Sequence, residues 1–209
     1  MKVEKKLVRY LALGDSYTVG ESVSERDCFP NLLAAVLQKK QFEVATPTII
    51  AKTGWTTDEL LAEINVTNFD NNYNLVSLLI GVNNQYRGGS IATYEVEFEE
   101  LLRKAILLAN DRKESVFVLS IPDWAHTPFG QNSERDLQKI SQEIDAFNAV
   151  NARISDAMAV TYFDITPITR AGLLEPTLIA ADGLHPSAIA YSRWVASMGN
   201  KVADRLKYF

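Results

Sequence analysis

The sequence contains few of the residues that hold metals or form covalent cross-links. Its 209 residues include one cysteine, Cys28, and two histidines, His126 and His185. A single cysteine has no partner within the chain for a disulfide bond. A zinc site of the usual kind needs about four cysteine or histidine ligands, so we expect no bound metal. The chain also lacks the Gly-x-Gly-x-x-Gly and P-loop motifs, and we expect no cofactor.

Long apolar runs and an excess of positive charge are also missing. No stretch approaches the ~20 apolar residues that a membrane-spanning helix requires. The first six residues carry a net positive charge, but the apolar run from Leu7 to Leu13 is short and broken by Arg9. We therefore expect no signal peptide and a cytoplasmic protein. The formal net charge is −5, from 21 basic and 26 acidic residues, which disfavours a nucleic acid as partner.

The overall composition is that of an ordinary globular protein. Hydrophobic residues make up 47% and charged residues 22%, both close to the average for globular domains. A chain of this length buries roughly 70% of the surface that its unfolded form exposes, so its core needs no cross-link. We predict one domain over residues 1–209. No pattern indicates its oligomeric state.

Short apolar runs alternate with longer amphipathic ones, which is typical of βαβ units around a parallel sheet. We predict strands over residues 8–13, 44–51, 75–80, 116–121 and 160–165. The first, third and fourth runs are almost continuously apolar, as expected for strands covered on both faces. Helical stripes of apolar residues occupy 94–108, 137–158 and 191–202. The longest irregular segments are 17–29, 124–133 and 166–186, and functional groups of such sheets gather on loops of this kind.

A serine follows the first predicted strand directly, in the segment Gly14-Asp15-Ser16. A serine on a tight turn beside a glycine can point its hydroxyl into a cleft. Serine and aspartate are also good N-cap residues, so an ordinary helix start explains this segment equally well. Gly14-Asp15-Ser16 alone therefore leaves both interpretations open.

Each histidine has an aspartate three residues before it. In Asp182-Gly183-Leu184-His185, this spacing lets the carboxylate accept from one ring nitrogen and leaves the other free as a base. Asp123 and His126 have the same spacing and compete for the same role. A serine needs such a base within hydrogen-bond reach to become a nucleophile, and His185 is the candidate that we favour, although a plain loop-to-helix junction also explains its segment.

Two further strand ends carry groups suited to stabilising an oxyanion. Gly54 follows the second predicted strand, and its backbone can approach a substrate closely. Asn83 follows the third, and a side-chain amide is a suitable donor to a developing negative charge. Each signal is weak when taken singly.

The four segments together resemble the SGNH (GDSL) hydrolase superfamily, and the resemblance extends from Gly14 to Pro186. It implies Ser16 as nucleophile, His185 as base and Asp182 as the carboxylate that orients the base. It also implies an oxyanion hole formed by the backbone N–H groups of Ser16 and Gly54 and the side chain of Asn83. The implied fold is a single three-layer α/β/α domain with a five-stranded parallel sheet of the flavodoxin-like kind, without a metal.

One residue departs from the pattern of this superfamily. The third block usually reads Gly-x-Asn-Asp, and Asn84 stands here in place of that aspartate. The donor Asn83 is kept, so the departure concerns its support. We expect the substitution Asn84→Asp to be tolerated. Asp15 belongs to the motif and is expected to bond within its own turn. The Gly-x-Ser-x-Gly elbow of α/β-hydrolases is absent, because position 18 is threonine.

Aromatic residues gather in the same loops, and we consider them candidates for substrate binding. They are Tyr17, Trp55, Tyr86, Trp124 and Phe129. Three of them stand beside or shortly after a proposed catalytic residue, which favours a partly aromatic acyl or alcohol pocket.

The resemblance implies a serine hydrolase that cleaves carboxylic esters through an acyl-enzyme, and we expect short-acyl or acetyl esters as the small-molecule substrates. Two alternatives remain open at this point. One is a thioesterase or lysophospholipase acting at the same site. The other is a non-catalytic binding protein on the same fold, for which Asn84 is the only hint.

Overall fold

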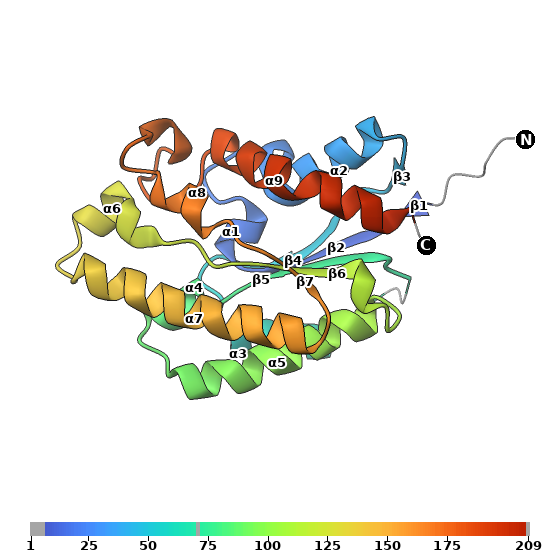
Figure 1. Cartoon of the computed structure of the whole chain (residues 1–209), viewed down its shortest axis with the longest axis horizontal. Helices are drawn as coiled ribbons and strands as arrows, with labels where there is room; N and C mark the ends of the chain where they lie inside the picture. The colour runs from blue at the N-terminus through green and yellow to red at the C-terminus, as the bar shows by residue number, and fades with distance from the viewer. Residues whose placement is uncertain (1–6, 70–71, 208–209) are drawn as a thin grey trace, which may run out of the picture.

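The computed structural model describes residues 7–69 and 72–207, so most of the basic N-terminal segment lies outside the described residues. Its centre is a five-stranded parallel sheet with the strand order β4-β2-β5-β6-β7 (Figure 1). The strands are β2 (Tyr10–Gly14), β4 (Thr48–Ala51), β5 (Leu75–Leu79), β6 (Val116–Leu119) and β7 (Thr161–Phe163). Four of them lie within the segments that the sequence predicts to be strands, and β2 extends one residue beyond its predicted segment.

Helices cover both faces of this sheet and complete three layers (Figure 1). One face carries α2 (Phe29–Lys39) and α9 (Ala188–Leu206), and the other carries α3 (Thr57–Val66), α5 (Ile91–Leu108) and α7 (Leu137–Ala157). All residues of β2, β5 and β6 are buried, because helices lie on both sides of these strands. The predicted three-layer α/β/α fold with a five-stranded parallel sheet is confirmed.

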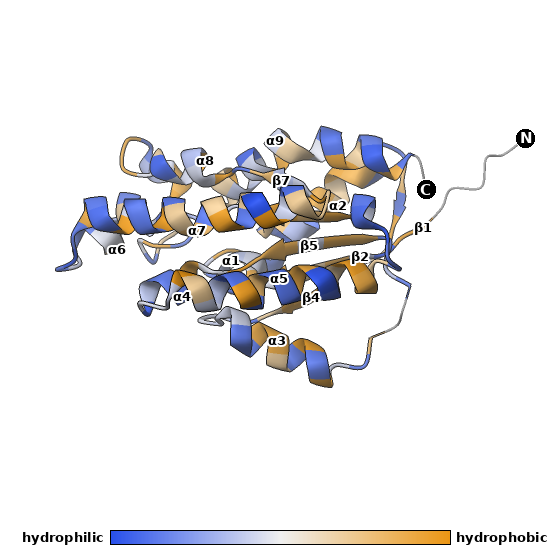
Figure 2. Cartoon of the chain, turned by 60° about the horizontal axis from the view of Figure 1, so that its bottom comes forward, coloured by the Kyte–Doolittle hydropathy of each residue, from blue (hydrophilic) through white to orange (hydrophobic). Residues whose placement is uncertain are grey.

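The helices pack through the apolar stripes that their sequences predict. The buried residues of α5 are Tyr94, Phe98, Leu101, Leu102, Ala105 and Leu108. Figure 2 shows the central strands as hydrophobic and the covering helices as striped. The stripe of α7 contains a buried asparagine, Asn151, whose Oδ1 accepts a hydrogen bond of 2.7 Å from the Tyr94 hydroxyl. This polar pair joins α5 to α7.

The first two predicted strands are each divided in two. Residues 7–8 and 43–44 form β1 (Leu7–Val8) and β3 (Glu43–Val44), which pair as a separate two-stranded sheet. Val8 pairs with Val44 and Leu11 with Thr48, so two residues of one segment lie opposite three of the other. The extra residue breaks the ladder, as in a β-bulge. The backbone N–H of Arg9 accordingly donates outside the ladder, to Oδ1 of Asn74 at 2.8 Å.

Short helices occupy the three segments predicted to be irregular, and two more lie elsewhere in the described part of the chain. Those in the predicted segments are α1 (Ser16–Val19), α6 (Pro128–Gln131), α8 (Thr166–Arg170) and the 3-10 turns η1 (Glu25–Asp27), η3 (Trp124–His126) and η4 (Pro176–Leu178), and the other two are α4 (Val82–Tyr86) and the 3-10 turn η2 (Lys113–Ser115). Several of them begin where a strand ends, so their first residues lie along the carboxyl edge of the sheet. Among the described residues, no helix combines the length and the apolar character that crossing a membrane requires.

Candidate active site

Ser16 lies at the carboxyl end of β2, a central strand, as the first residue of α1. The chain passes very close to β5 there. A Cβ on Gly14 would lie 2.4 Å from the Leu79 carbonyl oxygen, and only glycine avoids this clash. Asp15 is the N-cap of α1, and its Oδ1 accepts from the N–H of Tyr17 at 3.0 Å. The two interpretations of this segment are therefore compatible, because Asp15 caps the helix that presents Ser16.

A chain of hydrogen bonds connects Ser16 with the last loop of the protein. Nε2 of His185 lies 2.9 Å from the Ser16 Oγ, and Nδ1 of the same ring lies 2.6 Å from Oδ2 of Asp182. The other carboxylate oxygen of Asp182 accepts from the backbone N–H of His185 at 3.0 Å. The spacing of three residues thus places one carboxylate against both the ring and the backbone of the histidine.

Asp182 remains ionised despite its partial burial. Burial by itself would raise its pKa, but hydrogen bonds from the Ser22 hydroxyl, the Leu184 N–H and His185 outweigh this effect and lower the pKa to about 2. The Ser22 hydroxyl donates to Oδ2 at 2.7 Å, the oxygen that also contacts the ring of His185. A carboxylate with so many donors is a permanent negative charge beside the imidazole.

The loop that carries His185 is built as a turn before α9. Gly183 adopts φ +74°, in the left-handed region that favours glycine. The Gly183 carbonyl accepts from the backbone N–H of Phe129 at 2.9 Å. Helix α9 begins only at Ala188, with Ser187 as its N-cap, so Pro186 precedes the helix. The ring of Tyr17 packs against His185 with centroids 5.0 Å apart and thereby limits the tilt of the imidazole.

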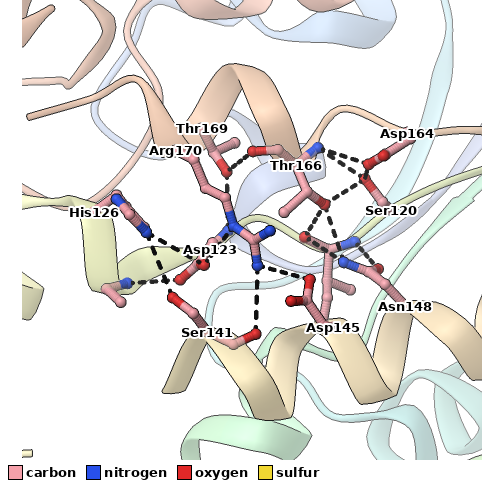
Figure 3. Close-up of polar contacts among 12 residues, drawn as sticks. Ser120, Asp123, His126, Ser141, Asp145, Asn148, Asp164, Thr166, Thr169 and Arg170 are labelled. Atoms are coloured by element: carbon pink, nitrogen blue, oxygen red, sulfur yellow. Dashed lines mark hydrogen bonds and ion pairs between the residues drawn. The ribbon is translucent and has the colours of Figure 1, made fainter. Parts of the chain in front are cut away.

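The competing pair, Asp123 and His126, belongs to a different network (Figure 3). Asp123 is buried, and its Oδ2 accepts from Nε of Arg170 at 2.9 Å. Nε2 of His126 lies 3.8 Å from that same oxygen and 3.5 Å from the hydroxyl of Ser141. The Asp123 carboxylate therefore forms an ion pair with Arg170 of α8, and this pair joins η3 to α8. The histidine that meets Ser16 is His185.

Asn83 and the loop of Gly54 are hydrogen-bonded to each other. Nδ2 of Asn83 donates to the Trp55 carbonyl at 3.0 Å, and an amide NH₂ group has a second hydrogen to donate. Gly54 adopts φ +88°, and its carbonyl accepts from Nη2 of Arg87 at 2.7 Å. The hydroxyl of Thr53, one residue earlier, donates to Glu21. Contacts from two other segments, α4 with its C-cap Arg87 and the segment of Glu21, thus hold this loop at the edge of the sheet.

Asn84 connects α4 with the start of α3. Its Oδ1 accepts from the Thr57 N–H at 3.1 Å, and its Nδ2 donates to the Thr57 hydroxyl at 2.7 Å. That hydroxyl in turn donates to Glu97. Because Thr57 follows the Gly54 loop by three residues, Asn84 supports this loop. It lies beside Asn83 in sequence, but its bonds go to α3.

A pocket of about 190 Å³ opens over Ser16 and His185. Four of the five predicted aromatic residues belong to its wall. The lining consists of Ser16, Tyr17, Val82, Asn83, Tyr86, Trp124, Phe129, Leu184 and His185. The remaining aromatic, Trp55, lies apart from this lining, and its side chain packs partly buried against the hydrophobic core.

The aromatic wall is held by polar contacts at its back and rim. Trp124 is buried and its Nε1 donates to Oε1 of Gln85 at 2.7 Å. Tyr86 and Phe129 both pack edgewise on Trp124, with centroids 5.3 and 5.9 Å away. The guanidinium of Arg135 lies 4.3 Å from the Tyr86 ring centroid and donates to the Tyr86 carbonyl. These contacts fix the placement of the aromatic rings that line the pocket.

Sequence reasoning missed several residues of this site. Val82 and Leu184 line the pocket, and both are immediate neighbours of residues that the sequence singled out, which is a usable signal. Ser22 contacts Asp182 across 160 residues of sequence. Neither its type nor its neighbours distinguish it from other loop serines, so no local pattern could have identified it.

Comparisons with known proteins agree with this architecture. The sequence profile of the GDSL-like lipase/acylhydrolase family matches residues 12–193. A lipase/acylhydrolase from Enterococcus faecalis superposes with a TM-score of 0.74 at 21% identity, covering 95% of this chain and 96% of that chain. For a catalytic mutant of an acetylxylan esterase from Geobacillus stearothermophilus, the TM-score is 0.72 at 16% identity, with 97% and 96% covered. No curated protein sequence matches significantly.

A psychrotrophic esterase, EstA from Pseudoalteromonas, shares the fold as well, with a TM-score of 0.70 at 17% identity over 95% of this chain and 98% of that chain. At such identities the structural likeness concerns the fold alone. A five-stranded parallel sheet between two layers of helices, with the motif residues at the ends of its strands, is the architecture of the SGNH hydrolases. The chain belongs to the GDSL-like lipase/acylhydrolase family, whose profile covers most of its length, and it is a carboxylic ester hydrolase.

Proposed function

We propose that the protein hydrolyses short-acyl esters through a covalent acyl-enzyme on Ser16. The observation that carries this proposal is the unbroken series of contacts from Ser16 Oγ to His185 Nε2 at 2.9 Å and from His185 Nδ1 to Asp182 Oδ2 at 2.6 Å. A hydroxyl becomes nucleophilic when a base within hydrogen-bond reach removes its proton. The ionised Asp182 orients the ring and stabilises the imidazolium that forms.

In the first half of the reaction, Ser16 Oγ bonds to the ester carbonyl carbon and its proton passes to Nε2 of His185. The carbonyl oxygen becomes an oxyanion. The free N–H of the Asn83 amide and the backbone N–H groups of Ser16 and Gly54 are proposed to donate to it, which is worth most where water is excluded. When the bond to the alcohol oxygen breaks, the alcohol leaves with the proton from His185.

In the second half, a water molecule attacks the acyl carbon and gives a proton to His185. The bond between Ser16 Oγ and the acyl carbon then breaks, Ser16 takes the proton back, and the carboxylic acid leaves. No step calls for a group beyond the chain's own residues and water.

The size of the pocket supports a short acyl group. Pockets that hold drug-sized ligands measure roughly 300–1,000 Å³, and the pocket over Ser16 measures about 190 Å³. Its walls are aromatic side chains held in place by neighbours, such as Trp124 through Gln85. An acetyl or similarly small group fits such a space, whereas a long chain would extend into solvent.

The nucleophile is tested by covalent labelling. A fluorophosphonate should modify Ser16 alone, and peptide mapping by mass spectrometry identifies the labelled residue. Ser16→Ala should lower kcat on a chromogenic acetyl ester by roughly 10⁴–10⁶-fold without unfolding the protein. Ser24→Ala, a substitution of an exposed serine whose side chain makes no capping bond, is the control and should keep full activity. A label on another serine would refute the assignment.

The acyl preference is tested with a series of esters from acetyl to octanoyl. A methylene contributes up to roughly 0.8 kcal/mol only when it is buried, so kcat/KM should stay flat or fall along the series. A steady rise would instead indicate an enclosed acyl channel and favour a thioesterase or lysophospholipase.

A further inference from the structure

The chain makes an unusual bend directly after the helix that presents Ser16. Gly20 adopts φ +83° and Ser22 adopts φ +64°. A positive φ costs little at glycine but is uncommon for other residues, and serine is not among the types that favour it. A Cβ on Gly20 would lie 2.5 Å from that of the buried Cys28, so the bend is packed against the core. The backbone is thus held in a conformation that serine does not favour by itself.

Two side chains of this bend contact two different parts of the site. The hydroxyl of Ser22 donates to Oδ2 of Asp182 at 2.7 Å. The carboxylate of its neighbour, Glu21, accepts from the hydroxyl of Thr53, which precedes Gly54. One short segment after the nucleophile helix therefore touches both the acid that orients the base and the loop of the proposed oxyanion hole.

We propose that Glu21 and Ser22 are positioning residues that fix the spatial relation between Asp182, the Gly54 loop and the nucleophile helix. The inference rests on the proposed function, in which these three elements act on one ester carbonyl. Neither residue belongs to the lining of the pocket, so their effect is exerted through Asp182 and Thr53.

The bond from Ser22 acts on the carboxylate oxygen that matters for the base. Oδ2 of Asp182 receives both the Ser22 hydroxyl at 2.7 Å and Nδ1 of His185 at 2.6 Å. Oδ1 is already engaged by the backbone N–H groups of Leu184 and His185. The Ser22 hydroxyl therefore holds one oxygen of the carboxylate while these amides hold the other, and together they fix its rotation. It also keeps the proton on the imidazole, since it stabilises the ionised carboxylate.

The decisive variant is Ser22→Gly, because glycine accepts φ +64° without strain and removes the hydroxymethyl group that bonds Asp182. We expect kcat for an acetyl ester to fall roughly 10-fold, the lower range for a hydrogen bond to a charged group, with KM unchanged. The rate of fluorophosphonate labelling at Ser16 should fall to a similar extent. The carboxyl carbon of Asp182, followed by carbon-13 NMR, should titrate at a higher pH. Ser24→Gly is the control and should change none of these.

Rescue separates positioning from a general disturbance of the loop. Ser22→Asn retains a donor and a residue type that tolerates positive φ, so it should recover most of kcat. For the other contact, Glu21→Ala should lower kcat several-fold, whereas Glu21→Gln keeps an acceptor for Thr53 and should stay near the parent. Glu25→Ala, in the exposed η1 turn, controls for the loss of one negative charge.

Two results would overturn the inference. One is a Ser22→Gly protein whose kcat and labelling rate stay within twofold of the parent, and the other is a Ser22→Asn protein as slow as Ser22→Gly. Both leave the proposed function standing, provided that the parent is labelled at Ser16. Failure of the parent to be labelled there would refute the proposed function itself.

Discussion

At the scale of single residues, the same short pattern occurs twice with different outcomes. Asp182 and Asp123 each precede a histidine by three residues. Asp182 bonds its own histidine at 2.6 Å, whereas Asp123 bonds Arg170 at 2.9 Å and lies 3.8 Å from His126. An arginine that reaches a buried carboxylate takes the position that an imidazole would otherwise fill. The charge that could orient His126 is therefore already compensated.

This difference predicts opposite effects of two alanine substitutions. His185→Ala should lower kcat for an acetyl ester by roughly 10⁴-fold or more, because Ser16 loses its base. His126→Ala should keep kcat within a few-fold, since the polar contacts of its imidazole go to Asp123 at 3.8 Å and Ser141 at 3.5 Å and not to Ser16. Steady-state kinetics of both proteins, with circular dichroism to verify folding, make the measurement. The reverse order of activities would assign the base to His126.

At the scale of elements, the site depends on how α3 and α4 are joined. Helix α3 follows β4 and helix α4 follows β5, the two strands that flank β2 in the sheet, and Asn84 bridges the helices through the backbone and the hydroxyl of Thr57. The Thr57 hydroxyl accepts from Asn84 and donates to Glu97, so each of its hydrogen-bonding capacities has a defined use. The family's usual aspartate would disturb this order, because a carboxylate cannot donate.

The contacts therefore reverse the expectation that Asn84→Asp is tolerated. Aspartate at this buried position would compete with Glu97 for the single hydroxyl hydrogen of Thr57, and two carboxylates would face each other across it. We expect the free energy of unfolding to fall by about 1–3 kcal/mol and kcat/KM to decrease. Adding Glu97→Gln should restore both, because its amide can donate to Thr57. Urea denaturation and kinetics of the single and double variants make the test, and an Asn84→Asp protein as stable as the parent would contradict it.

At the scale of the whole molecule, the site includes a buried carboxyl group next to the nucleophile. Asp15 is fully inaccessible to solvent; its Oδ1 accepts from Tyr17, and its Oδ2 has no hydrogen-bond partner among the described residues. Burial raises the pKa of Asp15 to about 7, although the N–H of Tyr17 opposes this by lowering it. The helix that presents Ser16 is consequently capped by a group that titrates near neutral pH.

A raised pKa in the folded state makes stability depend on pH. Between pH ~4 and ~7, the folded protein keeps a proton on Asp15 that the unfolded chain has lost, so the free energy of unfolding decreases as pH rises. Asp15→Asn keeps an acceptor for the cap and removes this titration. The difference in the free energy of unfolding between the variant and the parent should therefore shift in favour of the variant by on the order of 4 kcal/mol from pH 4 to pH 8. Urea denaturation at both values measures the gain, and a difference that does not vary with pH would show that Asp15 is ionised throughout.

The sequence alone predicts the layers and the five strand segments, because an apolar run or a helical stripe is a local property. Continuous burial of β5 follows from residues 75–79 themselves. It also predicts that Ser16, Gly54 and Asn83 share one edge, since the carboxyl ends of parallel strands meet there. The division of the first strand was missed because it depends on a register shift between two segments and on Asn74, 65 residues beyond Arg9.

Only the tertiary structure decided which partners these residues have. Ser16 meets His185 across 169 residues of sequence, Ser22 meets Asp182 across 160, and Asn84 meets Thr57 across 27. Each contact results from the packing of whole elements at a specific distance, and the residues involved have the same chemical types as others nearby. Spacing along the chain proposes two histidines for one role. In the folded protein Asp123 pairs with Arg170, and His185 is the histidine that contacts Ser16.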